Sequence, residues 1–148
     1  MKIRVELDSD LAEVEIVIRA ARFDAQLEQI QQALEQATAP PIIFYKGASE
    51  YFLDIDNILF FETDGSKIFA HTREDAYEVK HKLYELEDRL PYYFCRISKS
   101  SIINSKAIYS LEKSFSGSSS VRFYDTHKEV YVSRHYYQIL KEKLNETR

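Results

Sequence analysis

The feature that most constrains this 148-residue chain is a succession of short apolar segments separated by turn-forming residues, which begins at residue 42. Short apolar runs bounded by Gly, Asp, Asn and Ser are typical of β-strands. The pair Asp64-Gly65 between two such runs is a strong hairpin signal. The run before it, 59–61, is apolar on both faces, as expected of a central strand. Because aromatic residues favour strands, the 11 Tyr and 9 Phe agree with a mainly β fold of the α+β class.

The expected elements from residue 42 onward follow from the same signals. A flexible loop is expected at 116–120, and a single short helical turn at 102–104. Helices are expected at 80–89, ended by Pro91, and from Ser133 onward, where apolar residues recur at helical spacing. The expected strands are 42–46, 50–53, 58–63, 67–72, 76–79, 93–97, 108–114, 121–124 and 128–132.

The N-terminal part has a different pattern. Residues 2–7 alternate polar and apolar side chains, and residues 13–20 are rich in Val and Ile, so two strands are expected there. A helix is expected at 24–37, with Asp24 as its N-cap. A β-β-α unit of about forty residues is small for independent folding, so it must pack on the rest of the chain or on a second copy. We therefore divide the chain into an N-terminal unit, 1–41, and a main domain, 42–148.

The charge is unevenly distributed. The net charge of −4 does not by itself indicate a nucleic-acid partner. Residues 1–94, however, carry 10 Lys and Arg against 19 Asp and Glu, whereas residues 95–148 carry 10 against 5. The basic C-terminal third could attract a polyanion that the rest of the chain avoids, although the asymmetry could also be incidental.

Several functional classes lack a sequence signature. The four His residues show no metal-ligand spacing, no nucleotide-binding or hydrolase motif occurs, and three Gly residues are too few for a phosphate-cradling loop. We therefore expect no catalytic residue, no metal, no cofactor and no small-molecule substrate. The single cysteine, Cys95, lies in an apolar stretch, which favours a buried, reduced thiol. Without a signal peptide or a membrane-spanning run, a cytoplasmic protein is expected.

Two polar clusters remain as candidate binding sites. In the run Ser98 to Ser101, hydroxyl groups surround Lys99, and hydroxyls bind phosphate oxygens while Lys binds phosphate or guanine. In the second cluster, Ser133 could cap a helix whose first turn would project Arg134. The alternative interpretation is that the first cluster is only a polar turn and Arg134 a solvated side chain.

Four stretches of the chain carry a resemblance to a known family. They are ILFFETDG at 58–65, LYELEDRLP at 83–91, FCRISKSSIIN at 94–104 and VSRHY at 132–136. In this order and spacing, they make the chain from residue 42 resemble the LytTR family, the LytR/AlgR-type DNA-binding domain of bacterial transcription regulators. It is similar to the small members of that family that lack a receiver domain.

The resemblance implies an elongated antiparallel β fold with short helices that lays loops into successive grooves of DNA. Three positions are then expected to reach DNA: Ser66 and Lys67 after the Phe-Phe-Glu strand, Lys99, and Arg134. From their chemistry, the residues expected to hold phosphates are Ser98, Ser100, Ser133 and His135.

The sequence thus predicts a sequence-specific DNA-binding transcriptional regulator that acts as a dimer on paired sites. Its expected partners are double-stranded DNA, a second copy of the chain and, by resemblance, a small membrane protein. The alternative, which the negative net charge keeps open, is a protein-interaction module on the same fold that sequesters a partner regulator.

Overall fold

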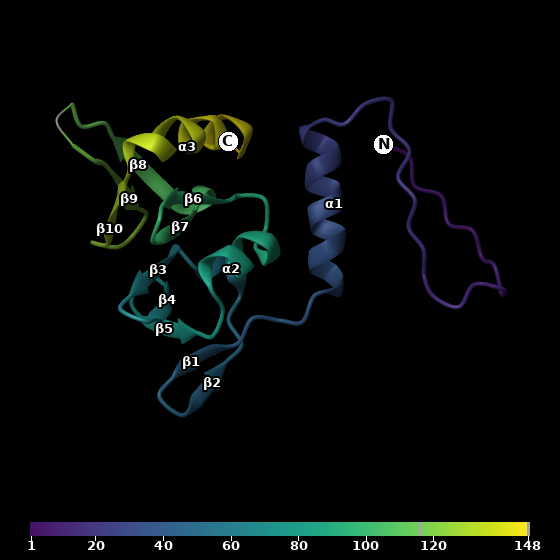
Figure 1. Cartoon of the computed structure of the whole chain (residues 1–148), viewed down its shortest axis with the longest axis horizontal. Helices are drawn as coiled ribbons and strands as arrows, with labels where there is room; N and C mark the ends of the chain where they lie inside the picture. The colour runs from purple at the N-terminus through teal and green to yellow at the C-terminus, as the bar shows by residue number, and fades with distance from the viewer. Residues whose placement is uncertain (116, 148) are drawn as a thin grey trace.

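The computed structural model describes residues 1–115 and 117–147. An N-terminal arm, residues 1–23, precedes helix α1, Ala25–Thr38. The described residues from 42 onward form a β domain, and the arm and α1 extend to one side of it (Figure 1). Residue 116, within the loop expected at 116–120, lies outside the described part of the chain. No helix in the described ranges is long and apolar enough to cross a membrane.

The β domain contains a seven-stranded antiparallel sheet with the strand order β2-β1-β5-β4-β3-β7-β6. Strand β3 lies between β4 and β7, so the prediction of a central strand there is confirmed. The tight turn that joins β3 to β4 contains Gly65 at a φ of 63°, a conformation that glycine adopts without strain. The strands are β1 Phe44–Lys46, β2 Ser49–Tyr51, β3 Phe60–Asp64, β4 Lys67–His71, β5 Ala76–Val79, β6 Phe94–Ser98 and β7 Ser101–Asn104.

A second, three-stranded antiparallel sheet has the order β10-β9-β8. It consists of β8 Ile108–Glu112, β9 Ser119–Phe123 and β10 Glu129–Val132. Two helices complete the domain, α2 Leu83–Arg89 and α3 Arg134–Thr147, together with two single turns of 3₁₀-helix, η1 Ile55–Asn57 and η2 Ser105–Ala107. The predicted mainly β, α+β architecture is therefore confirmed.

Two hydrophobic clusters hold these layers together. One lies between the two sheets and α3, with Phe60, Ile97 and Leu140 among its members. The other lies around α2, with Phe61 and Leu86 at its centre. Cys95 is buried in the first cluster, as expected, and burial raises the pKa of its thiol to about 11.

Four sequence predictions about secondary structure were wrong. The strands expected at 2–7 and 13–20 are extended but form no ladder, because no neighbouring strand in the described chain supplies hydrogen bonds to them. The helical turn expected at 102–104 is part of strand β7, which is buried between β3 and β6. Residues 80–82, expected to begin a helix, precede α2. The expected cap of α1 is confirmed, since the Asp24 carboxylate accepts a hydrogen bond from the Leu27 N–H.

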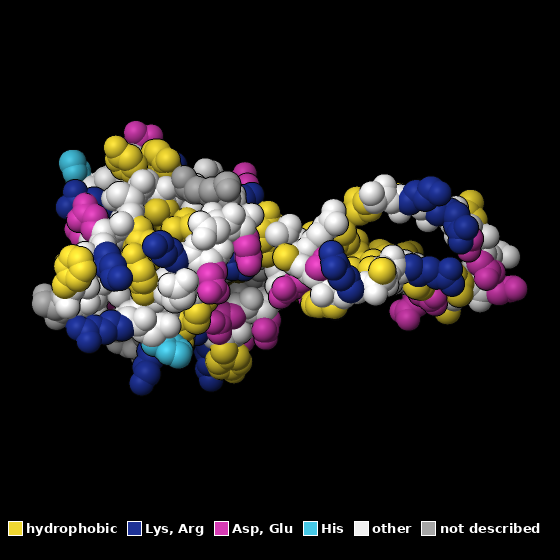
Figure 2. Space-filling view, turned by 90° about the horizontal axis from the view of Figure 1, so that it is seen from above, with side chains coloured by type: hydrophobic (Ala, Val, Ile, Leu, Met, Phe, Trp, Pro, Cys, Tyr) yellow, Lys and Arg dark blue, Asp and Glu magenta, His cyan; other side chains and the backbone are white. Residues whose placement is uncertain are grey.

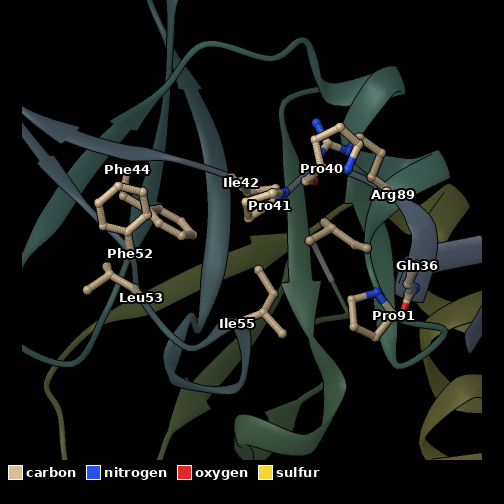
Figure 3. Close-up of a pocket in the computed structure, with 12 residues that line it drawn as sticks. Gln36, Pro40, Pro41, Ile42, Phe44, Phe52, Leu53, Ile55, Arg89 and Pro91 are labelled. Carbon is tan, nitrogen blue, oxygen red and sulfur yellow. The ribbon is translucent and has the colours of Figure 1, made fainter.

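The link between α1 and the β domain is held by a side chain of α2. Arg89 donates a hydrogen bond to the Pro40 carbonyl from its guanidinium. Beside this contact lies an apolar hollow of about 320 Å³, where Phe44 and Phe52 stand opposite Pro40 and Pro41 (Figure 3). Because proline fixes its own backbone φ, Pro40 and Pro41 make this joint stiff.

A polar contact connects the two sheets through His71. Its Nε2 lies 2.7 Å from Glu62 Oε1, and its Nδ1 lies 3.2 Å from Lys128 Nζ. Lys128 also donates to the carbonyls of Thr72 and Asp75. Burial lowers the pKa of His71 in spite of the Glu62 charge, and Lys128 acts in the same direction as burial. The neutral ring with its proton on Nε2 satisfies both neighbours, so the fold favours neutral His71.

We expect the stability of the protein to fall as the pH drops through about 6.5, the ordinary histidine pKa. The unfolded chain binds a proton at His71 in this range while the folded chain does not, so acid favours unfolding. In His71→Gln, which can donate to Glu62 and accept from Lys128 without titrating, the dependence should flatten. Thermal unfolding midpoints at pH 7.5 and 5.5 measure this effect. The exposed His127 supplies the control, His127→Gln, and equal flattening in both variants would contradict the assignment.

Candidate nucleic-acid interface

Two backbone hydrogen bonds bring together three segments that are far apart in the sequence. The N–H of Thr63, near the end of β3, donates to the Ser100 carbonyl at 2.8 Å. The N–H of Ser133, just before α3, donates to the Ile97 carbonyl at 3.0 Å. The β3–β4 turn, the β6–β7 turn and the start of α3, hereafter the three loops, therefore lie at the same end of the seven-stranded sheet.

All the predicted DNA-contacting residues lie on these three loops. Most of their side chains are exposed: Ser66, Lys67, Lys99, Ser100, Arg134 and His135. Ser98 and Ser133 are half-buried. The structure thus places the predicted residues near one another, and their contact with DNA stays a prediction.

The β6–β7 turn is ordered by its own hydroxyl groups. Ser98 Oγ accepts a hydrogen bond from the Ser100 N–H at 3.2 Å and lies 3.3 Å from Ser100 Oγ. Ser98 pairs with Ser101 across the ladder, which leaves Lys99 and Ser100 as the two residues of the turn. Lys99 is therefore presented at the tip of a short, hydrogen-bonded turn.

Arg96 supports this turn, although the sequence analysis did not assign it a role. Its Nε donates to the Ser98 carbonyl at 2.7 Å, and its Nη2 donates to the Lys99 carbonyl at 2.5 Å. Its Nη1 pairs with Glu87 of α2 at 3.2 Å. The ladder is irregular between Arg96 and Ser98, and one guanidinium binds both carbonyls that follow this irregularity.

A groove of about 550 Å³ lies between the β3–β4 turn and the β6–β7 turn and is bounded by the segment that leads into α2. Ser66, Lys67 and Lys99 line it. Further basic and aromatic residues that sequence reasoning missed also line it: Lys80, His81, Lys82, Tyr84 and Arg96. The Lys80-His81-Lys82 triplet between a strand and a helix was a signal that could have found the first three.

The groove is not uniformly basic. Glu78 and Glu85 also line it. Lys67 Nζ lies 3.9 Å from Glu78 Oε2, and His81 Nδ1 lies 3.5 Å from Glu85 Oε2. Lys99 and Lys82 are exposed. On the face of the β domain seen in Figure 2, Lys and Arg side chains are spread over the part away from α1, and acidic side chains gather nearer to α1.

The start of α3 differs from the expectation in one respect. The Ser133 carbonyl accepts hydrogen bonds from the N–H groups of Tyr136 and Tyr137, so the helix does begin there. The Ser133 hydroxyl, however, is buried and has no hydrogen-bond partner among the described residues. The prediction of a side-chain cap was therefore wrong, because the hydroxyl accepts no hydrogen bond from the N–H groups of the first turn.

No group of three or more His, Cys, Asp or Glu side chains in the described part of the chain is arranged to hold a metal ion. What the three loops offer chemically is exposed cations, hydroxyls and one imidazole. Such groups bind phosphate oxygens and the acceptor atoms of bases.

Comparisons with known proteins point in the same direction. The sequence model described as the LytTr DNA-binding domain matches residues 48–145. Two uncharacterized HTH-type transcriptional regulators from different Staphylococcus aureus strains are 29% and 27% identical to this chain over 146 residues, covering 98% of it and 99% of each relative. A LytTr DNA-binding domain of a putative methyl-accepting/DNA response regulator from Bacillus cereus has a similar fold. Its TM-score is 0.64 at 19% identity, over 72% of this chain and 98% of that one.

Removing the guanidinium of Arg96 should loosen the β6–β7 turn. For Arg96→Gln we expect a loss of about 1–2 kcal/mol in the free energy of unfolding, because hydrogen bonds to two carbonyls disappear. Amide hydrogen exchange should accelerate at residues 98–101 more than elsewhere. Arg122→Gln, at an exposed arginine on β9, is the matched control. Unchanged exchange at 98–101 in Arg96→Gln would contradict the supporting role.

Proposed function

This chain belongs to the LytTr DNA-binding domain family and is a DNA-binding transcriptional regulator, and we propose that it recognises a specific DNA sequence through the three loops. The observation that carries the proposal is their convergence through the Thr63–Ser100 and Ser133–Ile97 hydrogen bonds. A rigid sheet end that presents several exposed polar side chains fixes their spacing before DNA is bound. Less conformational entropy is then lost on binding.

Each loop has a proposed role. Lys99, at the tip of the β6–β7 turn, and Arg134, at the first position of α3, contact base edges. An arginine can bind guanine through two hydrogen bonds, which discriminates against other bases by about 1–3 kcal/mol. Ser66 and Lys67 contribute from the β3–β4 turn.

Phosphate contacts would orient the domain without reading sequence. Their proposed donors are Ser98, Ser100, Ser133 and His135. Ser133 would have to change its side-chain rotamer, since its hydroxyl is buried in the structure. Lys80 and Lys82 join this group because they line the groove that separates two of the loops.

We further propose that two copies act together on paired sites. A single β domain offers only three short loops, and linking two such domains makes the second binding event intramolecular. The expectation of a small membrane protein as an additional partner stays a prediction.

Lys99→Ala and Arg134→Ala should each weaken binding to the cognate site by about 1–3 kcal/mol, a loss of roughly 5- to 150-fold. The measurement is fluorescence anisotropy with a labelled duplex from the region upstream of the protein's own gene, against a scrambled duplex. Lys141→Ala, at an exposed lysine in the middle of α3 outside the three loops, removes the same charge elsewhere and should bind like the wild type.

The result also separates the two candidate functions. Tight binding that prefers the cognate duplex and falls in both loop variants supports direct recognition. If the wild type binds both duplexes equally weakly at low and at high salt, the three loops do not recognise that sequence. Either the recognised site then lies elsewhere or the protein acts by sequestering a partner regulator, and a pull-down for that partner decides between the two.

Lys82→Ala should weaken binding to the cognate and the scrambled duplex by the same factor. A phosphate contact carries no sequence information, and its loss should reduce the slope of log K against log salt by about 1. Titrations at three salt concentrations, again with Lys141→Ala as the reference, give this slope. A loss confined to the cognate duplex would instead make Lys82 a base-reading residue.

A further inference from the structure

The arm, residues 1–23, exposes apolar side chains in a regular pattern that the rest of the chain does not use. Ile3, Val5 and Leu7 alternate with charged residues and are 82%, 80% and 97% exposed. Val14 and Ile16 continue the pattern on the second extended segment. Figures 1 and 2 show the arm as an open loop that projects beyond α1, away from the β domain.

The N-terminal unit also has no core of its own. Helix α1 has no buried residue, although Leu27, Ile30 and Leu34 on one of its faces are half-buried. The backbone groups of both extended segments form no sheet. Exposed alternating apolar residues together with unpaired backbone groups mark a strand that is completed by another strand.

Pairing within the arm would leave one repulsive pair of charges. The Leu11 N–H donates to the Asp8 carbonyl, which makes residues 8–11 a turn. A hairpin continued from this turn would place Arg4 opposite Glu15, which is attractive, but Glu6 directly opposite Glu13. Like charges in directly opposed positions destabilise a strand pair.

Pairing with a second copy leaves no repulsive pair. If residues 2–8 run antiparallel to the same residues of another chain with Val5 on the twofold axis, Ile3 lies opposite Leu7, and Arg4 lies opposite Glu6. Lys2 then lies opposite Asp8. Each charged residue faces its opposite and each apolar residue faces another, as a self-complementary twofold interface requires. In the single chain, Arg4 pairs with its own Glu6, at 3.0 Å on the exposed surface.

We therefore propose that residues 2–8 form an antiparallel strand pair with residues 2–8 of a second copy, centred on Val5. Because side chains alternate along a strand, Ile3, Val5 and Leu7 of both copies then share one apolar face. The two Staphylococcus aureus relatives match this chain over 98% of its length, so the match includes the arm. The role of this pairing rests on the proposed function, because the pairing would supply the two linked copies that paired DNA sites need.

Charge exchange in the full-length chain tests the pairing. Arg4→Glu and Glu6→Arg should each raise the dimer dissociation constant, on the order of tenfold, because two attractive cross-strand pairs become repulsive. An equimolar mixture of the two variants should form a mixed dimer with the wild-type dissociation constant. In this dimer the two glutamates of one variant face the two arginines of the other. The Arg4→Glu/Glu6→Arg double variant restores both attractive pairs and should also dimerise. Sedimentation velocity of each variant and of the mixture gives the mass.

Cysteine cross-linking tests the register. In Val5→Cys the two cysteines face each other directly, about 4.5–5.5 Å apart between Cα atoms, within disulfide range. In Leu7→Cys they lie four residues apart along the ladder, roughly 13 Å, which is too far. The native Cys95 is buried with a raised thiol pKa, so it does not compete. Oxidation should therefore link Val5→Cys into a dimer and leave Leu7→Cys single.

The outcomes separate the pairing from the proposed function. A monomeric wild type at tens of micromolar, a mixture that fails to regain the dimer, or equal cross-linking of both cysteine variants would overturn the pairing. Binding of Arg4→Glu to a duplex that carries one half-site is measured alongside. If that binding persists while the pairing fails, only the pairing is wrong. If the wild type forms the dimer but recognises no site, the proposed function is wrong and the pairing stands.

Discussion

The structure depends on the burial of strand β3 from both sides. Phe60 and Phe61 are consecutive residues, so they point to opposite faces of the sheet, and each is buried in a different hydrophobic cluster. The neighbouring strand β7 repeats the arrangement with Ile103 and Ile102. These two strands therefore hold both clusters in fixed positions relative to each other. The turns at their shared end are held rigid by the same packing.

The β domain was largely predictable because its strands carry their own signals. Apolar segments and turn residues alternate from residue 42, and the two-sided apolar run at 59–61 identified the central strand. The errors have a common cause. Residues 102–104 form a strand because β3 and β6 pair with them from either side, and residues 2–7 form none because nothing in the described chain pairs with them. A strand forms only where two segments pair, and the residue pattern of one segment does not show whether a partner is present.

The residues of the candidate interface could likewise be predicted only in part. Lys99 and Arg134 stand out in the sequence as cations among hydroxyls, and the fold brings their loops together. Arg96 could not be assigned in advance, because its role lies in the two carbonyls that it binds around an irregular ladder. Lys82 lies far along the chain from Lys99, and only the groove shows that they share a surface. The spacing of residues along the chain indicates local chemistry. Which residue supports a turn, and which distant residues share a surface, is decided by the packing of the fold.

The fold separates the two differently charged parts of the chain in space. The basic residues of the C-terminal third supply the β6–β7 turn and the start of α3, while the acidic N-terminal part supplies the arm and α1. Residues 1–38, the arm with α1, carry 4 Lys and Arg against 8 Asp and Glu, and repulsion between this excess and phosphates would help keep the arm available for the proposed pairing. Pro40, Pro41 and the Arg89 contact then stiffen the joint between pairing element and interface. A stiff joint limits the separations at which two half-sites can be occupied together, so this joint would help set the spacing of the paired sites that a dimer selects.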